Sequence, residues 1–441
     1  MNAKANNTDK TQELCEKLYL AAKKSKTRRF HALYDKVYRS DILSSAWDSV
    51  RANRGAAGVD NETIDDILQN KDEILTHLQH TLQQGKYRPR KLRRVYIPKP
   101  DGERPLAIPT VRDRIIQTAT KQVIEPIFEA DFLDCSYGFR PNRCAHDALE
   151  KVRTTMNSGY TIVLDADIKQ FFDNIDHDKL LELVHNRISD RRILKLIRKW
   201  LKAGVMDSGV AEQTEIGTPQ GGVISPLLAN IYLHELDKFW TQQIVNGHLI
   251  RYADDFVILF KTREDAELGL QLIKAKLNEL HLELNEDKTR IVDTTKGKGF
   301  DFLGFHHRRL KSKTCNKYYA YKWPSAKSVK AFKAKIKSFL GKRSILNWNI
   351  EDVVQHINPV ITGWMNYYKY GNSARIFSQL DNYLHERMAL WWNKKHQKSG
   401  RRWKVYNWER HKSSKIQILS GSIQYWSALR MREKEGYRKA V

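Results

Sequence analysis

Two short acidic clusters, each set in apolar sequence, constrain the fold of this chain more than any other feature. In the segment HLIRYADDFVILF, Asp254 and Asp255 lie between two runs that are typical of strands. Neighbouring side chains of a straight strand point to opposite faces, so two adjacent carboxylates share a site only at a tight bend. Burying both is costly unless a cation compensates their charge. The alternative interpretation is a hairpin turn that happens to be acidic.

The second cluster ends another apolar strand. In the segment IVLDAD, Asp165 and Asp167 lie on one face of an extended strand, and Phe171 and Phe172 follow shortly after. Hard divalent cations prefer oxygen ligands. Two Mg²⁺ ions that bridge a primer 3′-oxygen and a nucleoside triphosphate need only a few protein carboxylates, because the substrate supplies other oxygens. Three carboxylates from two neighbouring strands therefore indicate a polymerase-like metal site.

The pattern of apolar residues indicates an α+β fold. Residues 1–80 have mostly helical spacing, and RRVYIPKPDGERPLAIPT places a Pro-Asp-Gly turn between two strand-like runs, which predicts a hairpin. Mixed strands and helices continue to about residue 306. Beyond that point the pattern predicts an almost entirely helical, basic region.

Positive charge gathers in the C-terminal part of the chain. The formal net charge is +26, and residues 321–441 hold 25 Lys+Arg against 7 Asp+Glu, together with eight of the eleven Trp. Cations bind phosphates while aromatic rings stack on bases, so this mixture favours nucleic acid as the partner. The alternative is a solvated basic face over ordinary aromatic packing.

Several classes of protein are disfavoured. The four cysteines lie far apart, which is unlike a disulfide scaffold or a zinc cluster. No apolar run approaches the roughly 18 residues that a membrane span needs, so we expect no membrane partner and a cytoplasmic location.

From about residue 45 to residue 400 the chain resembles a group II intron-encoded reverse transcriptase, also called a maturase. The resemblance rests on eight motifs in family order and on a C-terminal stretch similar to the family's maturase segment, NPVITGWMNYYKY with FSQLDNYLHERMALWW. The eight motifs are RGAAGVD, IPKPDGERPLAIPTVRDRIIQ, SYGFRPNRCAHDAL, DADIKQFFDNIDHD, GTPQGGVISPLLANIYLHELD, RYADD, LELNEDKT and FLGF.

The resemblance implies a right-hand polymerase. We expect an N-terminal helical extension with an extra fingers segment at residues 1–80 and reverse transcriptase fingers and palm at 81–306. A helical thumb or maturase domain is expected at 307–390, and a basic DNA-binding tail at 391–441. The RGAAGVD block is implied to contact the template strand and the intron RNA. In the thumb, Trp364, Tyr367 and Tyr368 are expected to pack helices together.

The resemblance also assigns the catalytic residues. It implies that Asp167 and Asp254 bind the two Mg²⁺ ions, that Asp255 is a weaker or more distant ligand, and that Asp165 is structural. The ring of Phe172 is implied to lie under the incoming sugar, where it excludes a 2′-hydroxyl; its alternative role is core packing.

Four further residues are implied to contact substrates. Lys99 and Arg104 on the first hairpin would hold the triphosphate, since cationic donors fit phosphate oxygens. Gln220 and the two glycines after it would pack close to the templating base pair. Lys288 would lie near the pyrophosphate leaving group.

The implied function is RNA-templated DNA synthesis with dNTPs, an RNA template and a DNA primer. The protein would also bind its group II intron RNA, assist splicing, and copy the intron into target DNA during retrohoming. No cysteine follows Cys315, so we expect no HNH endonuclease and priming from an existing 3′-end. Two alternatives stay open: a splicing factor that only binds RNA, and a free-standing reverse transcriptase used in host defence or DNA repair.

Overall fold

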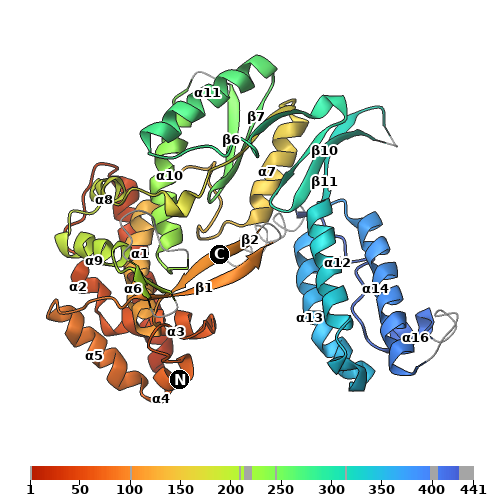
Figure 1. Cartoon of the computed structure of the whole chain (residues 1–441). Helices are drawn as coiled ribbons and strands as arrows, with labels where there is room; N and C mark the ends of the chain where they lie inside the picture. Colours follow the sequence, from red (N-terminus) through yellow and green to blue (C-terminus); the bar gives the residue numbers. More distant parts are fainter. Residues whose placement is uncertain are drawn as a thin grey trace.

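The structure is a computed structural model, and it describes residues 2–99, 102–207, 210–212, 221–243, 246–312, 315–397 and 406–426. In Figure 1, helices of the N-terminal part lie on the left, a long hairpin crosses the middle, a layer of strands and helices lies at the top, and a bundle of helices lies on the right. The predicted α+β class and the helical C-terminal part are confirmed.

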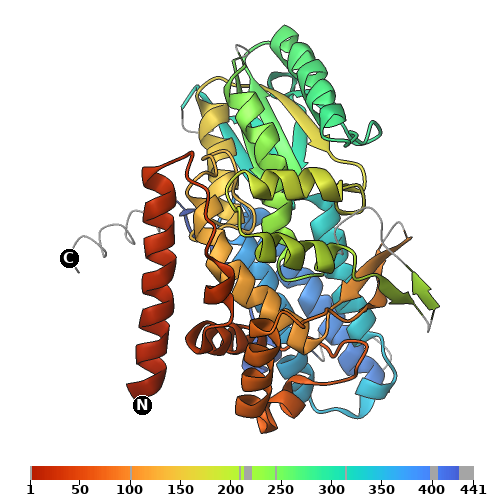
Figure 2. The same cartoon turned by 90° about the vertical axis from the view of Figure 1, so that its left-hand side faces the viewer.

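Helices dominate the N-terminal part. Figure 2 shows α1 as a long helix along one side of the molecule, where it packs against α3 and α6 (Val111–Glu129) and buries Ala22. Thr63 caps α4, because its hydroxyl accepts from the Asp66 backbone N–H while the Asp66 carboxylate accepts from the Thr63 backbone N–H. The helices before the first strand are α1 (Asn2–Lys24), α2 (Tyr34–Val37), α3 (Ser40–Ala52), α4 (Ile64–Gln69) and α5 (Lys71–Gln83).

The predicted hairpin is formed by β1 (Leu92–Lys99) and β2 (Gly102–Ile108), in antiparallel register from Arg93 opposite Ile108 to Lys99 opposite Gly102. Two short strands extend its sheet, β4 (Val205–Asp207) and β5 (Val210–Glu212), in the order β2-β1-β4-β5. In Figure 1 the hairpin runs from the N-terminal helices toward the C-terminal bundle.

The central sheet has the order β6-β7-β3-β8, and all neighbouring strands are antiparallel. Its side chains alternate between two hydrophobic cores, since Leu164 and Ile258 belong to one core while Val163 and Val257 belong to the other. The strands are β3 (Ile162–Asp167), β6 (Gly247–Tyr252), β7 (Asp255–Phe260) and β8 (Arg290–Asp293).

Helices cover both faces of this sheet. The first core includes buried residues of α10 and α11, whereas the second includes α7 and continues into the C-terminal bundle. The helices of this part are α6 (Val111–Glu129), α7 (Ala145–Asn157), α8 (His177–His185), α9 (Arg191–Leu201), α10 (Ser225–Thr241) and α11 (Arg263–Glu279).

A third sheet corrects the prediction that the chain is almost entirely helical after residue 306. β9 (Gly299–Phe302), β10 (Phe305–Lys311) and β11 (Tyr318–Pro324) form an antiparallel sheet that lies between the central sheet and the helical bundle. The prediction failed because two of the inward-facing residues are polar. His307 is fully buried and Lys322 is 3% exposed, so the inward-facing positions of FHHRRLK and YYAYKWP are not an apolar series.

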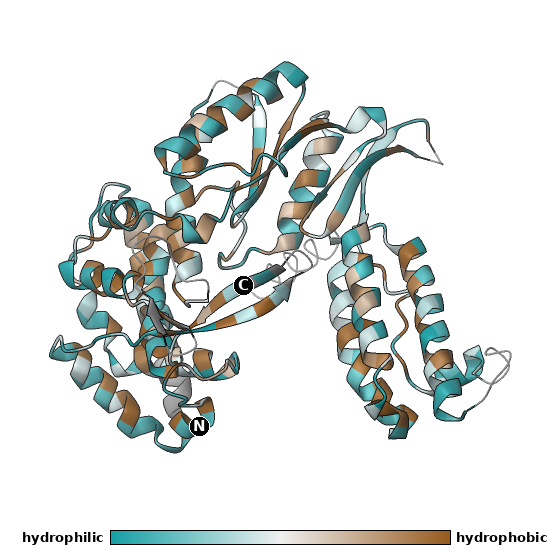
Figure 3. Ribbon diagram, viewed as in Figure 1, coloured by the Kyte–Doolittle hydropathy of each residue, from teal (hydrophilic) through white to brown (hydrophobic). Residues whose placement is uncertain are grey.

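The C-terminal bundle begins at residue 326. Figure 3 shows mixed hydrophobic and hydrophilic residues on its long helices, as expected for helices with one buried and one exposed side. The expected domain boundaries at 306 and 390 fall inside β10 and α14. The elements are α12 (Ala326–Leu340), the 3₁₀ turn η3 (Ser344–Asn347), α13 (Ile350–Tyr368), α14 (Ala374–Lys395) and α16 (Trp408–Ser413).

The described part of the expected tail packs against this bundle. Tyr406 and Leu419 are fully buried in the second core, and the carboxylate of Asp381 accepts from the backbone N–H groups of Leu419 and Ser420. Residues 406–426 therefore belong structurally to the bundle. Within the described ranges, no helix combines the length and apolarity needed to cross a membrane.

Candidate functional site: an acidic palm

The acidic turn lies at the end of the β6–β7 hairpin. Tyr252 and Asp255 are paired across the two strands, and Ala253 adopts a left-handed backbone with φ of +58° between them. In the neighbouring pair of strands, Asp167 at the end of β3 lies directly opposite Asp255. The structure therefore brings Asp167, Asp254 and Asp255 to one edge of the central sheet.

The carboxylates at this edge affect one another electrostatically. The pKa of Asp255 is raised to about 7, first by burial and then by the nearby carboxylates of Asp165, Asp254 and Asp167, in that order. Burial also raises the pKa of Asp165, although its ion pair with Arg290 (3.1 Å) opposes that shift. Negative charge is thus costly here, and a cation would relieve the cost.

Lys288 supplies one such cation. Its Nζ lies 2.9 Å from Oδ2 of Asp167, and its side chain is 66% exposed. The loop before β8 is held in place because the Asn285 backbone N–H donates to the Asp167 carbonyl oxygen at 2.8 Å. The LNEDKT motif therefore lies beside the acidic turn, in the region where Lys288 was expected.

The two phenylalanines after β3 have different surroundings. Phe171 and Phe172 begin a 3₁₀ turn, η1 (Phe171–Asp173), and their rings meet edge to face with centroids 5.2 Å apart. Phe171 is 2% exposed in the first core, whereas Phe172 is only partly buried at its border. The ring of Phe172 is the more accessible one.

Three predicted substrate contacts fall wholly or partly outside the described residues. Lys99 ends β1 and Arg104 lies on β2 opposite Ile97, but their side chains are not among those described. Gln220 lies outside the described residues altogether. Of the two following glycines, Gly221 has φ of +118°, and a Cβ there would lie 2.5 Å from the Ala107 carbonyl oxygen. This close approach to β2 requires glycine.

A fully buried ion pair, which the sequence did not reveal, supports the acidic turn. The guanidinium of Arg251 donates to both carboxylate oxygens of Asp237 and to the Ala253 carbonyl oxygen at 2.9 Å. It also donates to the side-chain oxygen of Asn230 at 3.1 Å. Arg251 thereby fixes the backbone one residue before Asp254. Its only signal in the sequence is a charged residue inside an otherwise apolar strand.

The aromatic residues of α13 were predicted to pack helices together, and they contact both neighbouring helices and the third sheet. Tyr368 is buried against Phe305, with ring centroids 4.9 Å apart, and Trp364 lies 4.3 Å from Tyr368. The hydroxyl of Tyr367 donates to the Leu303 carbonyl oxygen at 2.8 Å. These rings fasten α13 to the third sheet.

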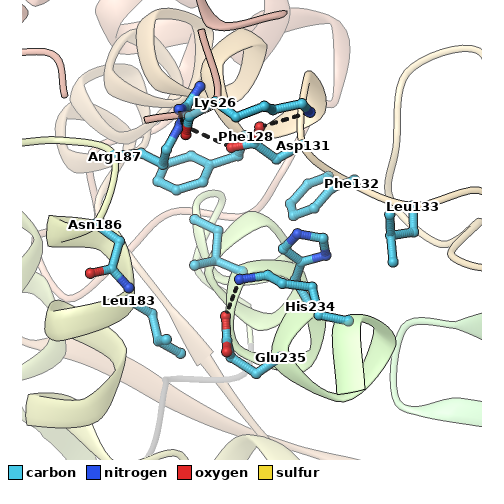
Figure 4. A pocket seen from close by; sticks show the side chains of 12 residues that line it. Lys26, Phe128, Asp131, Phe132, Leu133, Leu183, Asn186, Arg187, His234 and Glu235 are labelled. Atoms are coloured by element: carbon cyan, nitrogen blue, oxygen red, sulfur yellow. Dashed lines mark hydrogen bonds and ion pairs between the residues drawn. The ribbon is translucent and has the colours of Figure 1, made fainter. Parts of the chain in front are cut away.

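A separate cavity of about 350 Å³ lies between the end of α6, α8 and α10, and Lys26 from the segment after α1 also lines it. Figure 4 shows the Asp131 carboxylate between Lys26 and Arg187, with the ring of His234 opposite. None of the predicted site residues lines it. The cavity is therefore distinct from the acidic palm.

The donor set suits hard divalent cations, since it consists of carboxylate oxygens whose mutual repulsion a cation relieves. Among the residues that the structure describes, no group of three or more His, Cys, Asp or Glu side chains is arranged to hold a metal ion unaided. Substrate oxygens would have to complete the coordination, as expected for a metal that is bound together with a nucleotide.

Comparison with known proteins identifies the class. Residues 97–307 match the family described as reverse transcriptase (RNA-dependent DNA polymerase), and residues 329–408 match the group II intron, maturase-specific domain. The fold is thus that of a reverse transcriptase followed by a helical region. As a class, reverse transcriptases use divalent metal ions.

This chain is also similar to several individual proteins. Group II intron-encoded protein LtrA of Lactococcus lactis subsp. cremoris is 32% identical over 371 residues, covering 69% of this chain and 61% of LtrA. Protein YkfC of Escherichia coli (strain K12) is 36% identical over 345 residues, covering 68% of this chain and 89% of YkfC. A chain of a solved partial Cas6-RT-Cas1–Cas2 complex is 25% identical, covering 56% of this chain and 42% of its own, with a TM-score of 0.36.

The chain belongs to the family of group II intron-encoded reverse transcriptases that carry a maturase domain. It spans about 61% of the length of LtrA.

Proposed function

We propose that the protein is an RNA-directed DNA polymerase that binds its group II intron RNA, assists splicing and copies the intron into target DNA during retrohoming. The observation that carries this proposal is the register of the central sheet, which pairs Asp167 with Asp255 and places Asp254 at the adjoining turn. The match to the maturase-specific domain supports the role in splicing.

In the proposed reaction, the primer 3′-oxygen attacks the α-phosphorus of a dNTP, and the bond to pyrophosphate breaks. Asp167 and Asp254 would hold two Mg²⁺ ions, with Asp255 as a weaker or more distant ligand. When bound, Mg²⁺ activates the 3′-oxygen and neutralises charge on the phosphates.

The protein's own residues orient the substrates. The ring of Phe172 excludes a 2′-hydroxyl, and Lys99 and Arg104 bind the triphosphate. Lys288 releases Asp167 when the nucleotide arrives and moves its ammonium group toward the leaving pyrophosphate. The 2.9 Å ion pair between Lys288 and Asp167 supports this role, because the exposed lysine side chain already lies at the acidic edge.

A direct test uses the full chain with an RNA template, an annealed DNA primer and dNTPs. We expect primer extension that requires Mg²⁺, stops on chelation and resumes when Mg²⁺ is restored. In parallel, a group II intron transcript should splice faster with the protein at low Mg²⁺. Absence of extension on every RNA template would contradict the polymerase assignment, whereas an unchanged splicing rate would contradict only the maturase role.

A further inference from the structure

The loop 135–143, which contains most of the SYGFRPNRC segment, lies along β6 at the edge of the β6–β7 hairpin. The Tyr137 backbone N–H donates to the Arg251 carbonyl oxygen at 2.8 Å, and the Arg251 N–H donates to the Cys135 carbonyl oxygen at 2.8 Å. The loop thus continues the sheet beside β6 for a few residues. Its position is therefore coupled to that of the acidic turn.

Gly138 brings this loop into direct contact with the turn. A Cβ at Gly138 would lie 2.4 Å from the Ala253 backbone nitrogen and 2.9 Å from the Tyr252 carbonyl carbon, so no side chain fits there. The side-chain amide of Asn230 donates to the Gly138 carbonyl oxygen at 2.8 Å. Asn230 also accepts from Arg251, so one buried network holds both the loop and the turn.

The residue after Gly138 is held in an unfavourable conformation. Phe139 has φ of +56°, in the left-handed region that bulky residues rarely adopt. Arg140 follows it and is 6% exposed, because its guanidinium donates to the Glu129 carboxylate and to the Ser136 carbonyl oxygen at 2.8 Å. Anchors on both sides of Phe139 thus maintain the strained backbone.

This strain presents an aromatic ring to solvent beside the catalytic turn. Phe139 is 51% exposed, and its ring centroid lies 6.2 Å from that of Tyr252 with 42° between the ring planes. The left-handed backbone costs free energy, and a half-exposed ring gains little from burial to offset that cost. Such a combination is expected where the ring contacts a ligand.

We propose that Phe139 is a substrate-contacting residue that packs against the terminal nucleotides of the primer–template duplex, next to Tyr252. Aromatic rings bind nucleic acid without base preference, because every base and sugar offers an apolar face. This proposal rests on the proposed function, since the duplex must lie at the acidic turn for the ring to reach it.

Replacement of Phe139 by glycine separates this role from a structural one. Glycine tolerates the left-handed backbone, so Phe139→Gly should keep or raise the melting temperature of the full chain. The same variant should bind an RNA template/DNA primer duplex about 5- to 150-fold more weakly, the range given by the loss of one stacking contact. Phe139→Tyr, which restores a ring, should recover near wild-type affinity.

Leu268→Ala is the matched control, because Leu268 is 47% exposed on α11, at the outer edge in Figure 1. It should leave duplex affinity unchanged. The proposal would be overturned if Phe139→Gly bound the duplex with wild-type affinity. It would also be overturned if the melting temperature of this variant fell by several degrees. Failure of the wild-type chain to extend any primer would instead contradict the proposed function, so the two failures are distinguishable.

Discussion

Phe171 and Phe172 are neighbours in the sequence, but their surroundings give them different tasks. The 3₁₀ turn directs one ring into the first core and leaves the other partly exposed near the end of β3. Replacement of Phe171 should therefore affect mainly stability, and replacement of Phe172 should affect mainly substrate selection.

The first prediction concerns sugar selection. Phe172→Ala should raise ribonucleotide incorporation, because the 2′-hydroxyl gains space, and it should have little effect on folding. Phe171→Ala should instead lower the free energy of unfolding by about 3–5 kcal/mol through loss of a buried ring. Single-nucleotide insertion with matched deoxy- and ribonucleotides, run beside thermal melts, measures both. If Phe171→Ala relaxes sugar selection and Phe172→Ala only lowers stability, the two roles are reversed.

Among individual residues, those that belong to sequence motifs could be predicted. Residues whose role depends on burial in the folded chain could not. The acidic clusters were predicted because carboxylates interrupt apolar strands, and the family resemblance implied Asp167 and Asp254 as the metal ligands. Arg251 and Asp237 were not predicted, because a charged side chain on a strand or an amphipathic helix is usually solvated. Only the tertiary structure places these two side chains in one buried pair.

Among the elements, the sheet β9-β10-β11 departs most from expectation. Its inner face carries Lys322, whose Nζ is 3.7 Å from the Glu150 carboxylate and has no hydrogen-bond partner among the described residues. Glu150 also accepts from Arg153, so its charge is balanced without the lysine. The central sheet was predictable from its apolar strands, whereas this sheet was not, since its buried polar residues obscure the alternation.

The second prediction follows from this lysine. Burial lowers the pKa of Lys322 from 10.5 to about 8. Between these values the unfolded chain binds more protons, so the destabilisation that Lys322 causes is complete below about pH 8 and disappears as the pH rises toward 10.5. Lys322→Met should therefore be more stable than the wild type at pH 7, and its advantage should shrink by up to about 3 kcal/mol by pH 10.5.

Chemical denaturation of both proteins at pH 7 and pH 10 measures this difference. Lys327→Met on α12 is the control, because Lys327 is exposed and its replacement should have no comparable pH dependence. A Lys322→Met variant that is strongly destabilised at pH 7, with a deficit that does not change with pH, would contradict the account.

Across the whole molecule, positive charge is concentrated beyond residue 320, with a balance of +18 in residues 321–441. Much of it lies on the surface of the bundle, where α12 exposes Lys327, Lys330, Lys335 and Lys337 and contains no acidic residue. The acidic site therefore lies on the central sheet, whereas the basic surface lies on the helical bundle.

The third prediction is that binding to structured RNA depends strongly on salt. If roughly six to ten phosphates are neutralised, affinity should fall about 10³–10⁵-fold between 50 and 200 mM salt. Lys327→Glu combined with Lys330→Glu should reduce both the affinity and the salt slope. The matched pair Lys23→Glu with Lys24→Glu, also exposed but on α1, should have a smaller effect. A flat salt dependence, or equal losses in both variants, would argue against the basic surface of the bundle.

The most direct measurement of the central claim compares DNA synthesis with RNA binding in one variant, Asp254→Asn. The wild type, Asp254→Asn and the exposed control Asp178→Asn are assayed for primer extension on RNA and for affinity to intron RNA, with all three first shown to melt alike. Loss of one metal ligand should cost several kcal/mol of transition-state stabilisation and slow extension at least about 100-fold, while RNA affinity stays at the wild-type value. Extension at the wild-type rate by Asp254→Asn would contradict the assignment of the catalytic site.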